Sequence, residues 1–158
     1  MAAKPKPTKR KRHKGGGLLI TPADTYFSRC VRERAEWKCE RCGTYYAPPT
    51  KALQCSHFEG RANWATRFEP LNALALCHGC HERLGSFRFE HEQKHAEIFG
   101  AFAKDIIQEK ANDILLFKRM KQTRGVGEIA AHYKAEYERM MNERAAGLTG
   151  RLEFIGYE

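Results

Sequence analysis

The sequence predicts an α+β fold, in which helices flank a small β-hairpin. Two C-x2-C pairs, Cys39 with Cys42 and Cys77 with Cys80, enclose a segment, 43–76, that is rich in aromatic residues and interrupted by prolines. This composition favours short strands over a helix. Before the first pair and after the second, apolar residues recur at helical spacing. A chain of 158 residues is suited to one compact domain with appendages.

The N-terminal segment 1–17 is strongly basic. It holds seven of the 28 Lys and Arg residues and none of the 19 acidic residues, and it ends in three glycines. We expect a disordered tail with a glycine hinge. Clustered basic side chains bind nucleic acid by releasing its counterions, so we expect the run Lys9, Arg10, Lys11 and Arg12 to contact DNA. A targeting address or a solubilising tail would have the same composition.

The body of the domain is expected to span 18–147, with 148–158 as a C-terminal tail. Thr21 and Pro22 have the residue types of a helix start, which predicts a helix over 22–37. Short strands are expected within 43–60, and a loop with a return strand within 61–76. A further helix should begin near Cys77 or Cys80.

Helical periodicity then continues to about residue 146, with turns expected near Gly85, near Gly100 and at 124–127. The last helix carries an apolar stripe, which we interpret as a packing face and as a weak candidate for a dimer interface. The stripe consists of Ile129, Ala130, Tyr133, Tyr137, Met140 and Met141.

The two cysteine pairs have the spacing of a structural Zn(Cys)₄ site, and this spacing favours zinc over a disulfide scaffold. Because such thiols stay reduced inside cells, we expect a cytoplasmic protein that is not secreted. The sequence has no hydrophobic run of membrane-spanning length. Cys30 and Cys55 lie outside the pairs and are expected to be small buried residues.

Residues 56–85, SHFEGRANWATRFEPLNALALCHGCHERLG, resemble the H-N-H signature of the ββα-metal (His-Me finger) endonucleases. Within that superfamily the chain is most similar to the NinG (Rap) recombination nucleases of lambdoid phages. The resemblance is carried by Ser56-His57-Phe58, Arg61, Thr66-Arg67-Phe68, Asn72 and the run from Cys77 to His81.

The resemblance implies a zinc-bound, treble-clef-like ββα-metal (HNH) core and a metal-dependent DNA endonuclease. His57 would be the general base, since a neutral imidazole accepts a proton from water. Asn72 would position His57, and His81 would hold a catalytic Mg²⁺ or Mn²⁺ ion. Arg61 and Arg67 would contact the phosphate backbone. The expected substrate is branched or recombination-intermediate DNA, such as a Holliday junction or a junction of single and double strands. The expected setting is the bacterial cytoplasm, with a phage or prophage as the source.

Several points stay open in the sequence. Ser56 stands where many HNH enzymes have a second metal ligand, which leaves Glu59, Gln54 or water for that role. His78 is expected to face solvent, and Trp64 either stacks on a base or fills the core. Symmetric resolution of a four-way junction would require two active sites and hence a homodimer. A zinc-stabilised DNA-binding module without catalysis, or a protein-interaction module, is the alternative.

Overall fold

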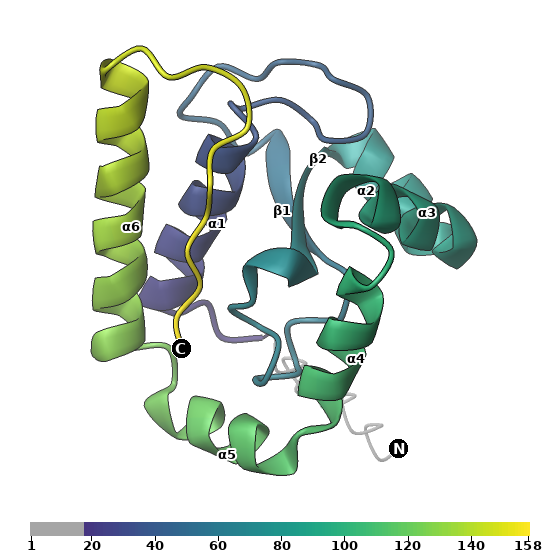
Figure 1. Ribbon diagram of the computed structural model, residues 1–158, viewed down its shortest axis with the longest axis vertical. Helices are drawn as coiled ribbons and strands as arrows, with labels where there is room; N and C mark the ends of the chain where they lie inside the picture. Colours follow the sequence, from purple (N-terminus) through teal and green to yellow (C-terminus); the bar gives the residue numbers. More distant parts are fainter. Residues whose placement is uncertain (1–17) are drawn as a thin grey trace, which may run out of the picture.

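The computed structural model describes residues 18–158, and six helices, a two-stranded sheet and one 3₁₀ turn follow each other within that range (Figure 1). In chain order they are α1 (Pro22–Arg34), β1 (Leu53–His57), η1 (Pro70–Asn72), β2 (Ala73–Cys77), α2 (His78–Ser86), α3 (Arg88–Phe99), α4 (Ala103–Asn112), α5 (Ile114–Thr123) and α6 (Glu128–Ala145). The predicted α+β class is therefore confirmed. The predictions for the basic tail 1–17, including Lys9, Arg10, Lys11 and Arg12, lie outside the described residues.

Helix α1 begins as predicted and ends earlier than predicted. The side chain of Thr21 accepts a hydrogen bond from the backbone of Asp24, and the Asp24 carboxylate accepts one from the backbone of Thr21, which is a complete capping box. The expected end at residue 37 is wrong, because Glu36 and Trp37 adopt the left-handed conformation with φ of 54° and 56°. This turn buries the Trp37 ring and directs the chain towards Cys39.

The sheet is an antiparallel pair of strands, with Leu53 opposite Cys77 and His57 opposite Ala73. Strand β1 lies inside the predicted segment 43–60, and β2 begins inside 61–76 but ends one residue beyond it, at Cys77. Leu53, Leu74 and Leu76 are buried in the core. Strand β2 continues directly into α2, so the second cysteine pair lies at the junction of strand and helix.

Helix α6 packs beside α1, although the two are far apart in the sequence (Figure 1). Ile129, Tyr133 and Met140 are completely buried, and the Tyr133 ring meets the Phe27 ring edge-on with centroids 5.2 Å apart. The apolar stripe of α6 is thus a packing face. The core of this same chain covers most of the stripe, and only Met141 remains largely exposed for the dimer interface that the sequence suggested.

Residues 148–158 are part of the domain, and the expected tail is wrong. This segment runs back along the molecule past α1 (Figure 1). The backbone N–H of Leu152 donates to the carbonyl of Arg34 at 3.1 Å, and Leu152 is buried. Phe154 packs against Phe27, with ring centroids 5.4 Å apart. Burial of these apolar side chains fixes the segment on the body.

The helical segment after the sheet has one more break than the sequence pattern predicts. Turns lie at Gly100 and at 124–127 as expected, and α2 ends at Ser86. A further break falls at Asp113, whose side chain caps α5 by accepting from the backbone of Leu116. Within 18–158, no helix combines the length and the hydrophobicity needed to cross a membrane.

Candidate metal centre and histidine cavity

The four cysteines of the two C-x2-C pairs form one cluster. The sulfur atoms of Cys39, Cys42, Cys77 and Cys80 all lie within 4.8 Å of one another, and those of Cys42 and Cys77 are 3.9 Å apart. Tetrahedral Zn–S bonds of about 2.3 Å would place the sulfurs roughly 3.8 Å apart. All six cysteines of the chain are free thiols, so the disulfide alternative is not formed. The donor set fits a structural zinc ion.

Hydrogen bonds hold the cluster against the sheet. The backbone N–H of Cys77 donates to the sulfur of Cys39 at 3.3 Å. Between the first two cysteines, the Glu40 carboxylate accepts from the backbone N–H of Ala75 at 2.7 Å and pairs with Arg34 of α1 at 3.3 Å. These contacts join the first cysteine pair to β2 and to α1, and they fix the start of α2.

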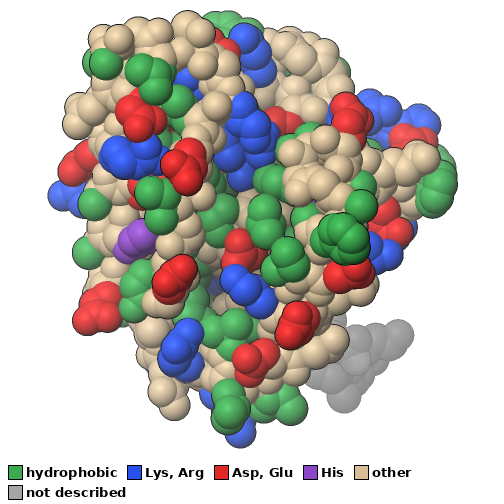
Figure 2. All heavy atoms as spheres, in the orientation of Figure 1, with side chains coloured by type: hydrophobic (Ala, Val, Ile, Leu, Met, Phe, Trp, Pro, Cys, Tyr) green, Lys and Arg blue, Asp and Glu red, His purple; other side chains and the backbone are tan. Residues whose placement is uncertain are grey.

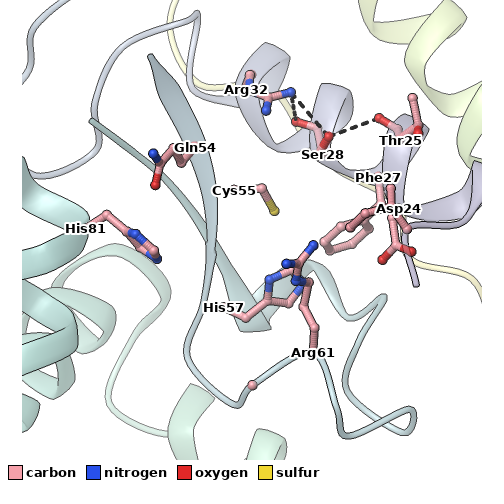
Figure 3. Close-up of a pocket in the computed structure, with 12 residues that line it drawn as sticks. Asp24, Thr25, Phe27, Ser28, Arg32, Gln54, Cys55, His57, Arg61 and His81 are labelled. Atoms are coloured by element: carbon pink, nitrogen blue, oxygen red, sulfur yellow. Dashed lines mark hydrogen bonds between the residues drawn. The ribbon is translucent and has the colours of Figure 1, made fainter. Parts of the chain in front are cut away.

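A cavity of about 520 Å³ lies beside β1, between α1 and the first turn of α2 (Figure 3). Its walls include His57 and Gln54 from β1, His81 from α2, Arg61 from the loop after β1, and Arg32 from α1. The structure therefore brings the two histidines of the predicted site into one cavity. Arg61 lies next to His57 in Figure 3, and His81 lies on the opposite side of β1 in that view.

The His57 ring is held in one tautomer. Its Nε2 atom lies 3.0 Å from the backbone carbonyl of Arg67. A carbonyl oxygen only accepts, so Nε2 carries the proton and Nδ1 keeps its lone pair. Burial lowers the pKa of His57 from 6.5 to about 4, against the opposing effect of the Arg67 carbonyl. The imidazole is neutral at physiological pH and Nδ1 is a proton acceptor.

Asn72 closes the loop between the two strands. Its side-chain oxygen accepts from the backbone N–H of Glu59 at 2.7 Å, and its amide nitrogen donates to the carbonyls of Glu59 and Thr66 at 2.9 Å each. Asn72 is completely buried. These bonds fix the backbone next to His57, which is the positioning geometry that the resemblance implies.

Arg67 is not a surface residue, so its interpretation as a DNA contact is corrected. Only 1% of its surface is exposed, and its guanidinium pairs with the Asp24 carboxylate of α1 at 2.7 Å. The guanidinium also lies over the Trp64 ring, 4.3 Å from the centroid. Trp64 is half-buried against the core through Phe68, so its ring serves packing in this structure. A phosphate has no access to Arg67.

Of the two side chains considered as a second metal ligand, Gln54 lines the histidine cavity and Glu59 does not. Gln54 and His81 line the same cavity, and they also line a second hollow together with residues of α2. Glu59 is instead paired with Arg88 at 3.4 Å. His78 is largely exposed and lies 3.3 Å from Glu82, one turn further along α2, as expected for a solvent-facing residue. His81 and Gln54 are thus the side chains that could hold an ion.

The sequence interpretation missed the contribution of α1 to the cavity. Thr25, Ser28 and Arg32 lie on one face of this helix and line the cavity wall (Figure 3). Their spacing of three and four residues is a signal that the sequence contains, because such residues share a helix face. Only the packing of α1 against β1 shows that this face is turned to the site.

Comparisons with protein-family models, with curated proteins and with solved structures find no match to this chain. The site geometry and the motif resemblance are therefore the features that point to a function.

Proposed function

We propose that the protein is a metal-dependent DNA endonuclease of the HNH kind, which hydrolyses phosphodiester bonds. The observation that carries this proposal is that His57 and His81 line one cavity, while a four-cysteine cluster fixes the helix that bears His81. A neutral imidazole with a free Nδ1, placed in a cavity with an arginine, is suited to general-base attack on a phosphate ester.

In the proposed reaction, Nδ1 of His57 takes a proton from a water molecule. The water oxygen attacks phosphorus in line with the bond to the 3′ oxygen, and that bond breaks. The departing 3′ oxygen takes up a proton from solvent, which gives a 3′-hydroxyl and a 5′-phosphate. Asn72 keeps the loop beside His57 closed through its three hydrogen bonds. Arg61 stabilises the charge that develops on the phosphoryl oxygens.

His81 and Gln54 are the residues that would hold the catalytic Mg²⁺ or Mn²⁺ ion. When bound, this ion supplies positive charge to the phosphoryl oxygens and to the departing oxygen. The four cysteines would hold Zn²⁺ as a structural ion, since a site with four protein ligands leaves no open position for a substrate.

The proposed substrate is DNA, and branched or recombination DNA is favoured by the motif resemblance. Charge supports a nucleic acid, because the basic segment 1–14 joins the described part of the chain close to the cavity. Ile20 lines the cavity, and the carbonyl of Leu19 accepts a hydrogen bond from Arg67.

A zinc-stabilised DNA-binding module without catalysis is the second candidate, and one observation favours it. Asp24 is the one acidic side chain that lines the cavity among the described residues, and it is paired with Arg67. The residue directly before His57 is Ser56, which is buried and has no carboxylate. A hard cation would then have only one histidine and one amide as protein ligands.

Labelled linear, flapped and four-way DNA, each incubated with the purified protein and with Mg²⁺, Mn²⁺ or EDTA, distinguishes the two candidates. The endonuclease is expected to cleave in the presence of metal and to leave 5′-phosphate ends, and the His57→Ala variant is the inactive control. Binding without cleavage under every metal condition would support the non-catalytic module and contradict the proposed activity.

A further inference from the structure

The arginines within 18–158 divide into two groups by their partners. Most of them pair with a carboxylate within the chain, among them Arg34, Arg83, Arg88, Arg139 and Arg144. On the face seen in Figure 2, basic and acidic side chains accordingly lie next to each other. Such pairs leave little net charge for a ligand, and those among them that are exposed contribute little to stability.

The two arginines that line the histidine cavity, Arg32 and Arg61, belong to the other group. Neither has a carboxylate partner anywhere in 18–158, and 1–17 contains no acidic side chain. The carboxylate of Asp24 in the cavity wall is already neutralised by the buried guanidinium of Arg67. With His57 neutral, the cavity therefore carries two positive charges that the protein does not balance, and an anion would balance them.

Arg32 is held in a fixed position by two elements. Its Nε donates to the carbonyl of Leu53 at the start of β1 at 2.7 Å. Its Nη1 donates to the carbonyl and to the hydroxyl of Ser28, at 3.3 and 3.2 Å, and that hydroxyl donates to the carbonyl of Thr25 at 3.1 Å (Figure 3). Nη2 has no hydrogen-bond partner among the described residues. A guanidinium fixed through two of its nitrogens, with the third free, is prepared to bind a phosphate oxygen.

Arg32 of α1 is bonded to the first residue of β1, Leu53, whereas His57 is the last residue of that strand. Leu53 and His57 are the first and last residues of the strand, so their backbones are roughly 13 Å apart at about 3.3 Å per residue. A single phosphate at His57 therefore does not also reach the end of the strand at which Arg32 is fixed. The two arginines are suited to different phosphates of one strand.

We infer that Arg32 binds a second phosphate of the strand that carries the reacting one, so that the cavity accepts at least two phosphates of a polynucleotide. The placement of the reacting phosphate at His57 and His81 rests on the proposed function. Arg32 is then a positioning residue that selects a nucleic-acid strand over an isolated phosphodiester.

The first test measures DNA binding in EDTA as a function of salt, for Arg32→Gln and for Arg29→Gln as its matched control. Arg29 lies on the same helix and has no carboxylate partner among the described residues, but it packs over Tyr26 and Tyr137 and does not line the histidine cavity. Loss of one phosphate contact should reduce the log–log slope by about 0.9 on duplex DNA or about 0.7 on a single strand. We expect this reduction in Arg32→Gln and little change in Arg29→Gln. Equal changes in the two variants, or an unchanged slope in Arg32→Gln, would overturn the inference.

The second test compares cleavage of DNA with hydrolysis of bis(4-nitrophenyl) phosphate, which has one phosphate only. Arg32→Gln should lower kcat/KM for DNA about tenfold, as expected for about 1.4 kcal/mol of lost binding, and should leave the small diester unaffected. An equal loss on both substrates would contradict the assignment of Arg32 to a second phosphate. If the unaltered protein hydrolyses neither substrate, the proposed endonuclease fails, and the salt slope still decides the role of Arg32.

Arg32→Gln also removes the hydrogen bond to Leu53. Thermal melting and the variant Arg32→Lys are the controls for a loss of folding from this cause. This variant keeps the positive charge and should retain the salt slope of the unaltered protein. If Arg32→Gln has a lowered Tm, the salt slopes of two other variants decide the result. These are Arg32→Lys and Ser28→Ala, and the latter removes a hydrogen-bond partner of Nη1 without changing the charge. If Arg32→Lys stays folded but its salt slope is reduced, Arg32 does not act through its charge alone, and the result counts against a charge contact.

Discussion

His57 and Arg67 are joined through a backbone atom: Nε2 of the histidine lies 3.0 Å from the carbonyl oxygen of the arginine. The side chain of Arg67 is in turn paired with Asp24 at the start of α1. The orientation of the proposed base therefore depends on a buried ion pair between the loop and the first helix. Arg67 positions His57 through its backbone carbonyl, and its buried side chain is inaccessible to a phosphate.

Arg67→Met is expected to destabilise the fold, because it leaves the Asp24 carboxylate buried without its partner. Breaking a buried pair by removing one member costs about 3–5 kcal/mol, which corresponds to a fall in Tm of about 6–20 °C for a chain of this length. Calorimetry measures this fall. Arg61→Met is the matched control, since Arg61 has no carboxylate partner in the described chain. It should melt normally yet bind DNA less well. The reverse pattern would restore Arg67 as a DNA contact.

The pH dependence of cleavage reports on His57. Burial lowers its pKa from 6.5 to about 4, so the imidazole stays unprotonated and able to accept a proton well below pH 6.5. We expect kcat/KM for DNA to stay constant as the pH falls through 6.5 and to decline only towards about 4. The His81→Asn variant, in which position 81 does not titrate, should show the same profile. A decline centred at 6.5 in both proteins would mean that a solvent-exposed group is the base.

The same shift has a consequence for stability. An unfolded chain protonates His57 near pH 6.5, whereas the folded chain resists protonation until about pH 4. The unfolded state therefore binds more protons between these values, and the stability of the fold falls as the pH is lowered through this window. His57→Ala should reduce this dependence while it abolishes cleavage. The exposed His78, changed to alanine, should alter neither.

Removal of one cysteine of the cluster should remove both zinc and the fold. Cys80→Ser leaves three thiolates at the start of α2, and metal binding at such sites is coupled to folding. We expect loss of bound zinc by elemental analysis and loss of the cooperative melting transition. Cys55→Ser is the control, because Cys55 lies on β1 outside the cluster and should leave the zinc content unchanged. A folded Cys80→Ser protein with unchanged melting would exclude the four-cysteine zinc site.

Substitutions at His81 distinguish a metal ligand from a structural residue. His81→Ala should be nearly inactive, whereas His81→Asn should retain cleavage, because an amide oxygen can replace the imidazole nitrogen as a donor. The related nucleases that the motif resembles have Asn at this position. Asn should also shift the preference towards Mg²⁺, since oxygen donors suit this ion and imidazole suits transition metals. Cleavage rates in Mg²⁺, Mn²⁺ and Co²⁺ test this shift, and equal inactivity of the two variants would contradict the assignment.

Local signals in the sequence predicted the parts of the fold that local chemistry determines. Thr21 and Pro22 marked a helix start, because capping involves only neighbouring residues. The C-x2-C spacing predicted the cysteine cluster, since each pair brings its two sulfurs together on its own. The break at Asp113 had a signal too, an acidic residue able to cap the next helix, but the helical periodicity on both sides obscured it.

The burial of Arg67 and the packing of 148–158 could not be predicted in this way. Arg67 lies in a polar stretch, and its partner Asp24 is 43 residues earlier in the chain, so no local pattern connects them. Leu152 and Phe154 stand among polar residues near the end of the chain, and only the completed surface of α1 gives them a place to pack. Such pairings depend on the tertiary arrangement, which overrides local preference.

The pairing of α1 with α6 sets an order of events during synthesis on the ribosome. The partners of α1 come late in the chain: the Cys30 thiol donates to the carbonyl of Tyr133, 103 residues further on, and Arg144 pairs with Glu33 across 111 residues. A nascent chain that has reached Cys80 possesses every thiolate of the metal cluster, yet the side of α1 that packs on α6 is still uncovered. Metal capture can thus precede closure of the core, and the growing chain needs shielding of that face until α6 has emerged.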